Sequence, residues 1–207
     1  PREQEVKWRV KILSRMSRAL TFLCEFLRRP TQIGAVAPSS QALAREMVEQ
    51  AKVREAEVIV EFGAGTGVMT KEIERCRSAN SHFFSIEQNP TLVEILRQEL
   101  PQVDLCCQSA ADLPQLLRER QLTEVQAIVS GLPWAAFPDK LQDELLQPAV
   151  DSLVTGGRFV TFAYLQGLLL PSGRHFAHKI GRVFKEVRKS RIIWNNLPPA
   201  FVYVCTK

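Results

Sequence analysis

A glycine-rich turn at residues 61–67 carries the clearest chemical signal in this sequence. It consists of Glu61-Phe62-Gly63-Ala64-Gly65-Thr66-Gly67, with an apolar run before it and helical periodicity after it. Because glycine has no Cβ, such a turn lets the backbone bend tightly and approach a bound ligand closely. A dinucleotide-binding turn has the pattern Gly-x-Gly-x-x-Gly, which would require glycine at position 68, where this chain has Val68. The turn therefore predicts a ligand site, but not a dinucleotide site of that pattern.

A second carboxylate, Glu87, ends the next apolar run, Phe83–Ile86. A carboxylate at that point can accept hydrogen bonds from both hydroxyls of a ribose. Together, the Glu-x-Gly-x-Gly-x-Gly spacing of residues 61–67 and the later Glu87 resemble the S-adenosylmethionine-binding motif of methyltransferases. The resemblance implies that S-adenosylmethionine is the cofactor, with Glu61 and the turn at its methionine part and Glu87 at its ribose; the alternative is a structural turn with a solvated glutamate. The expected cofactor contacts are Glu61, Gly63, Ala64, Gly65, Thr66, Gly67, Glu87, Gln88, Ala110, Ala111 and Ser130.

Two further loops follow predicted strands. In a methyltransferase fold the loop 106–112 flanks the adenine, so Asp112 either accepts from the adenine amino group or caps the following helix.

The loop Ser130-Gly131-Leu132-Pro133-Trp134 would lie where the methyl group is transferred, and in amino methyltransferases the matching loop orients the attacking nitrogen. Trp134, with Phe137 nearby, could stack on a cationic head group or belong to the core. Tyr164, at the end of a later strand, could position the amine or relay its proton, or be a rim aromatic. The expected catalytic residues are Tyr164, Ser130, Gly131, Leu132 and Trp134.

Alternating strands and helices must position these loops. Such alternation predicts a parallel sheet covered on both faces, and the turn-rich segment 195–199 predicts a final antiparallel strand. This is the α/β, Rossmann-like architecture of class I methyltransferases. Predicted strands span 58–62, 82–86, 103–107, 125–130, 158–164, 183–194 and 200–206; predicted helices span 39–51, 68–77, 90–100, 112–120, 139–152 and 174–181.

Residues 1–30 are predicted to form a separate basic amphipathic helix, and residues 31–207 the methyltransferase domain. Apolar residues follow a 3.6-residue period over 3–28. This helix would lie in a membrane interface, or pack on the domain with a solvated basic face. Its expected membrane contacts are Lys7, Trp8, Lys11, Arg15 and Arg18.

The charge of this 207-residue chain is unevenly distributed. Residues 1–29 hold eight basic and three acidic side chains, residues 174–191 hold seven basic and one acidic side chain, and the rest of the chain is acidic. Two basic segments favour a polyanionic partner, either an anionic membrane surface or nucleic acid. The composition, with 45% hydrophobic and 24% charged residues, excludes a disordered chain.

Cysteine spacing and hydropathy indicate the compartment. The five cysteines include no Cys-x-x-Cys pair, so neither a disulfide framework nor a zinc site is expected, and no other metal site either. The longest uncharged run, 159–173, is too short to span a bilayer. The N-terminal stretch is not expected to be a signal peptide, because charges interrupt its apolar residues throughout. Because Pro1 is not a start methionine, residues could be missing before it. These features predict a cytoplasmic protein, peripherally associated with the inner face of the cell membrane.

Four segments, in this order, give a more specific resemblance: residues 32–40, the turn 61–68, Ser130-Gly-Leu-Pro133 and Asn196-Leu-Pro-Pro-Ala-Phe-Val202. Together they are similar to the bacterial phospholipid N-methyltransferases of the PmtA type. The resemblance implies stepwise methylation of phosphatidylethanolamine towards phosphatidylcholine. Ornithine-lipid N-methyltransferases and rRNA adenine dimethyltransferases share this ancestry and are the alternatives. Nucleic acid is the less favoured partner, because the chain has no room for the helical domain that the rRNA enzymes usually carry.

A lipid substrate would also explain the second basic segment. The apolar loop Leu165–Pro171 precedes the basic residues Arg174, Lys179 and Arg182. It could dip between lipids while a cation contacts the lipid phosphate, or it could be part of a core helix with a solvated face.

Overall fold

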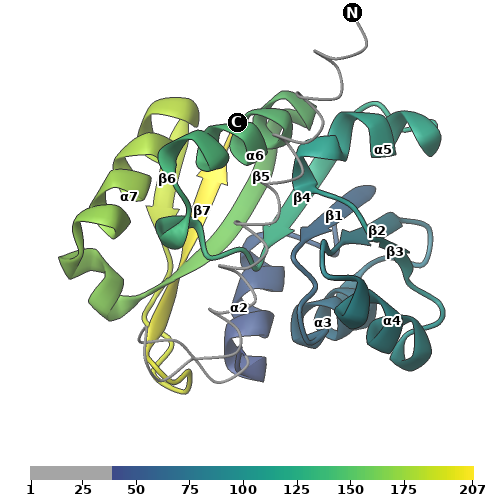
Figure 1. The fold of residues 1–207 in the computed structure, drawn as a ribbon, viewed down its shortest axis with the longest axis horizontal. Coiled ribbons are helices and arrows are strands. Elements are labelled where there is room, and N and C mark those ends of the chain that lie inside the picture. Colours follow the sequence, from purple (N-terminus) through teal and green to yellow (C-terminus); the bar gives the residue numbers. More distant parts are fainter. Residues whose placement is uncertain (1–38) are drawn as a thin grey trace, which may run out of the picture. The chain divides into compact units, whose positions relative to one another are not determined.

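The structure is a computed structural model and describes residues 39–207. The predicted helix within residues 1–30, with Lys7, Trp8, Lys11, Arg15 and Arg18, lies outside the described residues. Within the described range, seven strands form one sheet in the order β3-β2-β1-β4-β5-β7-β6 (Figure 1). The strands are β1 (Val58–Phe62), β2 (His82–Ile86), β3 (Asp104–Cys106), β4 (Val125–Ser130), β5 (Leu153–Tyr164), β6 (Glu186–Lys189) and β7 (Ala200–Thr206).

Strands β1 to β5 are parallel, and β7 is antiparallel to both of its neighbours, β5 and β6. The predicted fold class is therefore confirmed. The chain reverses its direction of strand addition between β1 and β4. In open parallel sheets, ligands bind at such a switch point, beyond the carboxyl ends of the strands.

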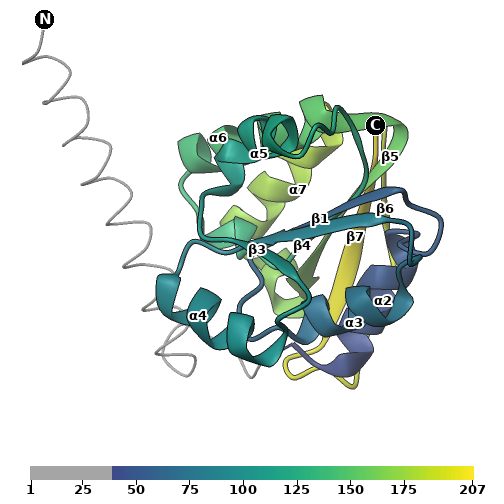
Figure 2. The same cartoon turned by 90° about the vertical axis from the view of Figure 1, so that its right-hand side faces the viewer.

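Helices cover both faces of the sheet (Figure 2). One face carries α2 (Gln41–Gln50), α3 (Val68–Cys76) and α4 (Pro90–Glu99); the other carries α5 (Leu113–Glu119), α6 (Asp139–Ser152) and α7 (Pro171–Val183). Three short 3₁₀ helices, η1 (Ala110–Asp112), η2 (Trp134–Ala136) and η3 (Leu165–Leu169), follow β3, β4 and β5.

Strand β1 shows why the apolar runs are continuous. All five of its side chains are buried, and alternate residues enter opposite cores: Val60 and Phe62 pack on the α5–α7 side, and Ile59 on the α2–α4 side. A strand covered on both faces needs apolar residues at every position. The buried Glu61 in this strand is therefore the exception that calls for a functional explanation.

Several predicted boundaries differ from the structure. Strand β5 begins at Leu153, five residues before the predicted start, and a register shift against β4 accommodates the left-handed Gly156. Helix α7 begins at Pro171, because proline at the first helical position has no amide hydrogen to leave unpaired. The predicted strand 183–194 is reduced to β6, since Val183 ends α7 and the Ser190 hydroxyl accepts from the Val202 amide instead of continuing the regular ladder.

Candidate functional site

The glycine turn lies between the end of β1 and the start of α3. Gly63, Gly65 and Gly67 have φ values of 76°, 54° and 77°, a left-handed region that side chains disfavour. A Cβ on Gly63 would lie 2.8 Å from the Leu132 side chain, and one on Gly67 would lie 2.5 Å from Leu96. At Gly65 the nearest such atom is 4.0 Å away. The positive φ values thus favour glycine at all three positions, and the open space at Gly65 leaves its backbone accessible to a ligand.

Gly131 brings the loop after β4 against this turn. Its amide donates to the Phe62 carbonyl at 2.8 Å, and a Cβ here would lie 2.8 Å from the Gly63 carbonyl oxygen. Leu132, the next residue, contacts the turn from the same side. Three predicted site residues from two distant segments therefore meet at the switch point.

We predict that Gly131→Ala lowers the affinity for S-adenosylmethionine roughly tenfold or more, because the added methyl group must push the turn away from its position. Isothermal titration calorimetry would measure this. Gly181→Ala on α7 is the matched control, since a Cβ there meets no atom within 4 Å beyond its chain neighbours and the backbone of its own helix. Equal affinities for the two variants would contradict the close approach of the loops.

Glu87 supports the turn from the end of β2. Its side chain is 4% exposed; one oxygen accepts from the Gly65 amide at 2.9 Å and the other from the Asn89 amide at 2.8 Å. Each carboxylate oxygen has a second lone pair. Glu87 can therefore hold the turn and still accept hydrogen bonds from a ribose. Gln88, beside it, is half-buried.

Glu61 is fully buried at the carboxyl end of β1. Its Oε2 accepts from the Thr70 and Ser85 hydroxyls at 2.8 and 2.7 Å, whereas its Oε1 has no hydrogen-bond partner within residues 39–207. Burial raises the pKa of Glu61 from its usual 4.5 to about 7; Ser85 and Thr70 oppose this, and the negative charge of Glu87 adds to it. Thr70 and Ser85 were not predicted as site residues, although a serine inside the apolar run of β2 was the available signal.

These residues fit S-adenosylmethionine. The orphaned Glu61 oxygen suits the amino group of its methionine part, the open backbone at Gly65 allows close approach, and Glu87 suits its ribose. Two other predicted contacts lie in the glycine turn, where Ala64 is buried and Thr66 is exposed. Two more lie in the loop after β3, where Ala110 is buried and Ala111 is half-buried.

The third loop, residues 106–112, shows the partners of Asp112. Its carboxylate accepts from the Ser109 amide at 3.2 Å, and the Ser109 hydroxyl accepts from the Ala111 amide at 3.2 Å. This reciprocal arrangement is a capping box. Asp112 therefore closes the turn of η1, but it does not cap the following helix α5 with its side chain.

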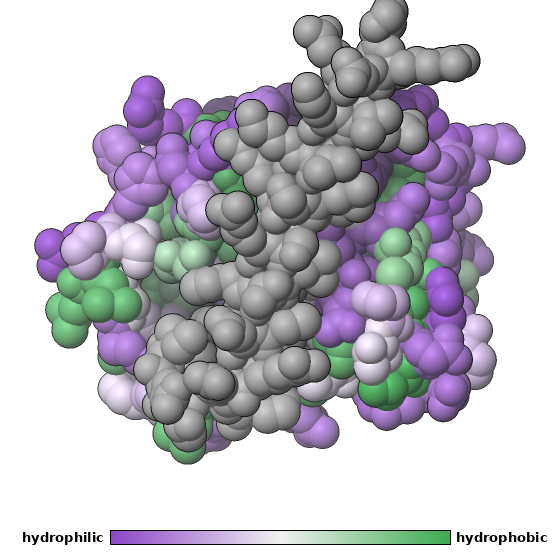
Figure 3. Space-filling view, viewed as in Figure 1, coloured by the Kyte–Doolittle hydropathy of each residue, from purple (hydrophilic) through white to green (hydrophobic). Residues whose placement is uncertain are grey.

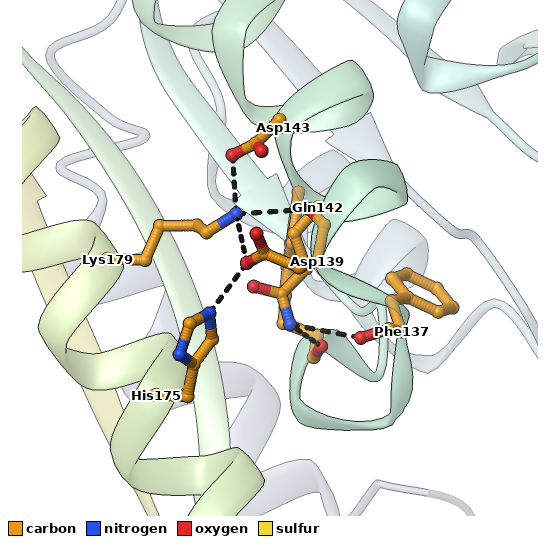
Figure 4. A network of polar contacts seen from close by, with 7 residues as sticks. Phe137, Asp139, Gln142, Asp143, His175 and Lys179 are labelled. Atoms are coloured by element: carbon orange, nitrogen blue, oxygen red, sulfur yellow. Dashed lines mark hydrogen bonds and ion pairs between the residues drawn. The ribbon is translucent and has the colours of Figure 1, made fainter.

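The loop after β4 is built around Trp134, and here one expectation is wrong. The Trp134 side chain is 2% exposed, its Nε1 donates to the buried Ser130 hydroxyl at 2.9 Å, and its ring stacks on Phe176 of α7 at 5.5 Å. A ring buried in this way presents no free face to a cationic head group. Ser130 and Trp134 instead fix the shape of the loop, and the Gln142 amide adds hydrogen bonds to the carbonyls of Trp134 and Phe137 (Figure 4).

Tyr164 lies half-buried at the carboxyl end of β5, in edge contact with Phe162. Burial raises its pKa, so the phenol keeps its proton at neutral pH. It is suited to hydrogen bonding, but not to accepting the proton of an amine.

The basic residues of α7, one of which was expected to contact a lipid phosphate, differ in their partners. Lys179 pairs with Asp139 at 2.7 Å and with Asp143, both on α6, and His175 approaches Asp139 at 2.6 Å (Figure 4). Lys179, followed by His175, holds the pKa of Asp139 below its usual range. Arg182 is eight residues beyond Arg174, roughly 12 Å along the helix, so it lies towards the opposite edge of the sheet. Only Arg174 stays at the loop that precedes α7, where its Nε donates to the Leu168 carbonyl at 3.1 Å.

The described part of the chain shows neither a metal centre nor a membrane span. Residues 39–207 contain no group of three or more His, Cys, Asp or Glu side chains arranged to hold a metal ion. Nor does any helix in that range have the length and apolar character needed to cross a bilayer.

Solved methyltransferase structures share this fold. An O-methyltransferase from Bacillus cereus in complex with SAH is 14% identical, with a TM-score of 0.62, and the match covers 90% of this chain and 91% of that chain. The O-methyltransferase TomG from Streptomyces achromogenes is also 14% identical, with a TM-score of 0.61 over 84% of this chain and 82% of that chain. TrmN from Thermus thermophilus is 18% identical, with a TM-score of 0.57 over 81% of this chain, which spans only 48% of TrmN.

A sequence relative is more informative. No protein-family model matches the chain. However, the ornithine lipid N-methyltransferase of Singulisphaera acidiphila is 31% identical over 187 residues, covering 89% of this chain and 93% of that protein. The chain therefore belongs to the ornithine lipid N-methyltransferase family, within the S-adenosylmethionine-dependent methyltransferases.

Proposed function

We propose that the protein methylates the primary amine of an ornithine lipid, with S-adenosylmethionine as the methyl donor. The observation that carries the proposal is the 31% identity to an ornithine lipid N-methyltransferase across 89% of the chain. The site supports it, because the carboxylates and glycines expected for this cofactor meet at one point of the sheet.

The chain supplies mainly alignment in this mechanism. The bound cofactor provides an electrophilic methyl group on a sulfonium. Glu61, the glycine turn and Glu87 hold the donor, while the loop 130–134, made rigid by Ser130 and Trp134, forms the side from which the amine arrives. Tyr164 positions the amine through its hydroxyl. A primary alkylamine is protonated at neutral pH, with a pKa of about 10, so the amine loses its proton to solvent before attack.

Phosphatidylethanolamine is the second candidate substrate, since residues 130–133 and 196–202 resemble the phospholipid N-methyltransferases. Its head group carries a phosphate, for which one of Arg174, Lys179 and Arg182 was the expected partner. Asp139 and Asp143 engage Lys179, which leaves the exposed Arg174 as the cation beside the loop that precedes α7. The identity to an ornithine lipid N-methyltransferase therefore decides the order of the two candidates in favour of ornithine lipid.

The test is methyl transfer from labelled S-adenosylmethionine to separate mixed micelles of ornithine lipid and phosphatidylethanolamine, with unmodified rRNA as a third substrate. Label in the ornithine lipid, lost in Glu87→Ala and reduced roughly 10-fold or more in Tyr164→Phe, is the expected result. Label confined to phosphatidylethanolamine or to RNA would overturn the proposed substrate while leaving the cofactor site in place.

Lipid methylation at a bilayer would make the protein peripheral to the membrane. We assign residues 1–30 to an interfacial helix that associates with the inner face of the cell membrane and residues 31–207 to catalysis. The basic charge of residues 1–29 supports this assignment, since each Lys or Arg near an anionic surface contributes about 1 kcal/mol.

A further inference from the structure

Two apolar segments outside the cofactor site are exposed. One is the junction of η3 and α7, where Leu169 and Leu170 are 75% and 54% exposed. The other is the β6–β7 connection, residues 190–199, where Trp194 and Leu197 are 68% and 77% exposed. With Ile192, these segments hold five of the seven large hydrophobic side chains exposed within residues 39–207. Figure 3 shows hydrophobic surface at the lower left, over the start of α7, and a smaller area at the bottom, over the β6–β7 connection.

Both segments lie on the carboxyl edge of the sheet. Strand β5 ends at Tyr164, which pairs with Ala200 at the start of β7, and the Leu165 amide donates to the Pro199 carbonyl at 2.9 Å. Glu87 and the glycine turn follow the carboxyl ends of β2 and β1 on this same edge. The exposed apolar side chains therefore border the edge at which the methyl acceptor must arrive.

The β6–β7 connection is held in place from within. Asn196 is 2% exposed; its Oδ1 accepts from the Ser40 amide at 2.9 Å and its Nδ2 donates to the Pro198 carbonyl at 2.7 Å. Ile193 is buried and its amide donates to the Ala200 carbonyl at 2.7 Å. Trp194 and Leu197 each follow one of these buried anchors and extend outward. A rigid loop that presents apolar side chains to water is typical of an interaction site.

The charges beside this surface identify its partner. The Arg191 side chain is 82% exposed, although its Nε pairs with Glu46 at 3.3 Å. Lys189, at the end of β6, and Arg174, in the first turn of α7, are also exposed. Tryptophan, leucine and basic side chains together suit the interface of an anionic bilayer, where the indole lies at head-group level. A second copy of this chain would bring the same positive charges onto the surface and be repelled.

We propose that the β6–β7 connection and the η3–α7 junction insert Trp194, Leu197, Leu169 and Leu170 into an anionic bilayer. This contact orients the carboxyl edge, and with it the cofactor site, towards the lipid head groups. The choice of a bilayer as partner rests on the proposed lipid substrate; the exposed surface itself does not.

Tryptophan fluorescence tests the insertion directly. In full-length Trp8→Phe protein, Trp134 is buried and hydrogen-bonded, so a response to vesicles reports on Trp194. With vesicles of anionic lipid brominated near the head group, we expect quenching and a blue shift, both absent in Trp8→Phe/Trp194→Phe. Unchanged emission in Trp8→Phe protein that co-sediments with the vesicles would overturn the proposal.

Vesicle co-sedimentation gives the second measurement. Trp194→Ala/Leu197→Ala should weaken binding to anionic vesicles roughly tenfold or more, whereas Ile95→Ala/Val183→Ala, two exposed apolar residues on other surfaces, should bind as wild type. Loss of binding in the Trp194 variant without methylation of any lipid by the wild type would refute only the proposed substrate. Equal binding of both double variants, with lipid methylation intact, would refute only the insertion surface. If the wild type were a dimer and Trp194→Ala/Leu197→Ala a monomer, the surface would instead bind a second copy of the chain.

Discussion

Glu87→Ala should lower the affinity for S-adenosylmethionine roughly 100-fold or more, because two charge-assisted hydrogen bonds to the ribose are lost. The structure adds a second cause. Glu87 also accepts from the Gly65 amide, so its removal frees the turn that approaches the cofactor. Calorimetric titration of the purified variant would measure the change.

The same substitution should also reduce stability. The Gly65 amide loses its acceptor at a site where the Glu87 side chain is 4% exposed, and a buried donor left unpaired costs about 1–3 kcal/mol. Glu87→Gln is not conservative here, because one of the two oxygens that accept backbone amides becomes a donor. Glu94→Ala, on the exposed face of α4, is the matched control and should change neither quantity. Wild-type cofactor affinity in folded Glu87→Ala would remove Glu87 from the site.

Glu61→Gln should stabilise the cofactor-free protein at pH 8 and weaken its binding of S-adenosylmethionine. Burial raises the folded-state pKa of Glu61 to about 7 from its usual 4.5. Between these values the folded protein holds a proton that the unfolded chain has released, so the free energy of unfolding falls as pH rises from about 4.5 to about 7. Above pH 7 the folded protein bears the full cost of ionising the buried Glu61. A pKa difference of about 2.5 between the folded and unfolded states corresponds to about 3 kcal/mol of stability.

The glutamine side chain of this variant would accept from the Thr70 and Ser85 hydroxyls without ionising, which is why the substitution removes the penalty. Urea denaturation of both proteins from pH 4 to pH 9 would measure the effect: the two proteins should converge near pH 4 and diverge above pH 7. Cofactor affinity should rise with pH through about 7 in the wild type only, since the ionised Glu61 attracts the amino group of the cofactor. Parallel unfolding profiles across this range would show that Glu61 has the same pKa in the folded and unfolded states.

Local patterns were sufficient for much of the fold. The predicted bounds of β1, β2, β4, β7 and α6 agree with the structure, because buried apolar runs and a 3.6-residue period are set by steric rules that act over a few residues. The same holds for the glycine turn, where the left-handed backbone conformation selects glycine directly. The family resemblance pointed to lipid N-methylation, although the ornithine-lipid alternative is now better supported than phosphatidylethanolamine.

The roles of several side chains depended on partners far away in the sequence. Trp134 is a core residue because Phe176 covers it, and Lys179 is engaged because α7 packs beside Asp139 and Asp143 of α6. Asn196 fixes the β6–β7 connection through Ser40, 156 residues earlier. Periodicity and composition describe how a segment folds, but which side chains face each other across two segments is decided by their packing. The sequence by itself therefore determined the elements and the cofactor turn, and only the tertiary structure decided which aromatic and charged side chains remain free to meet a substrate.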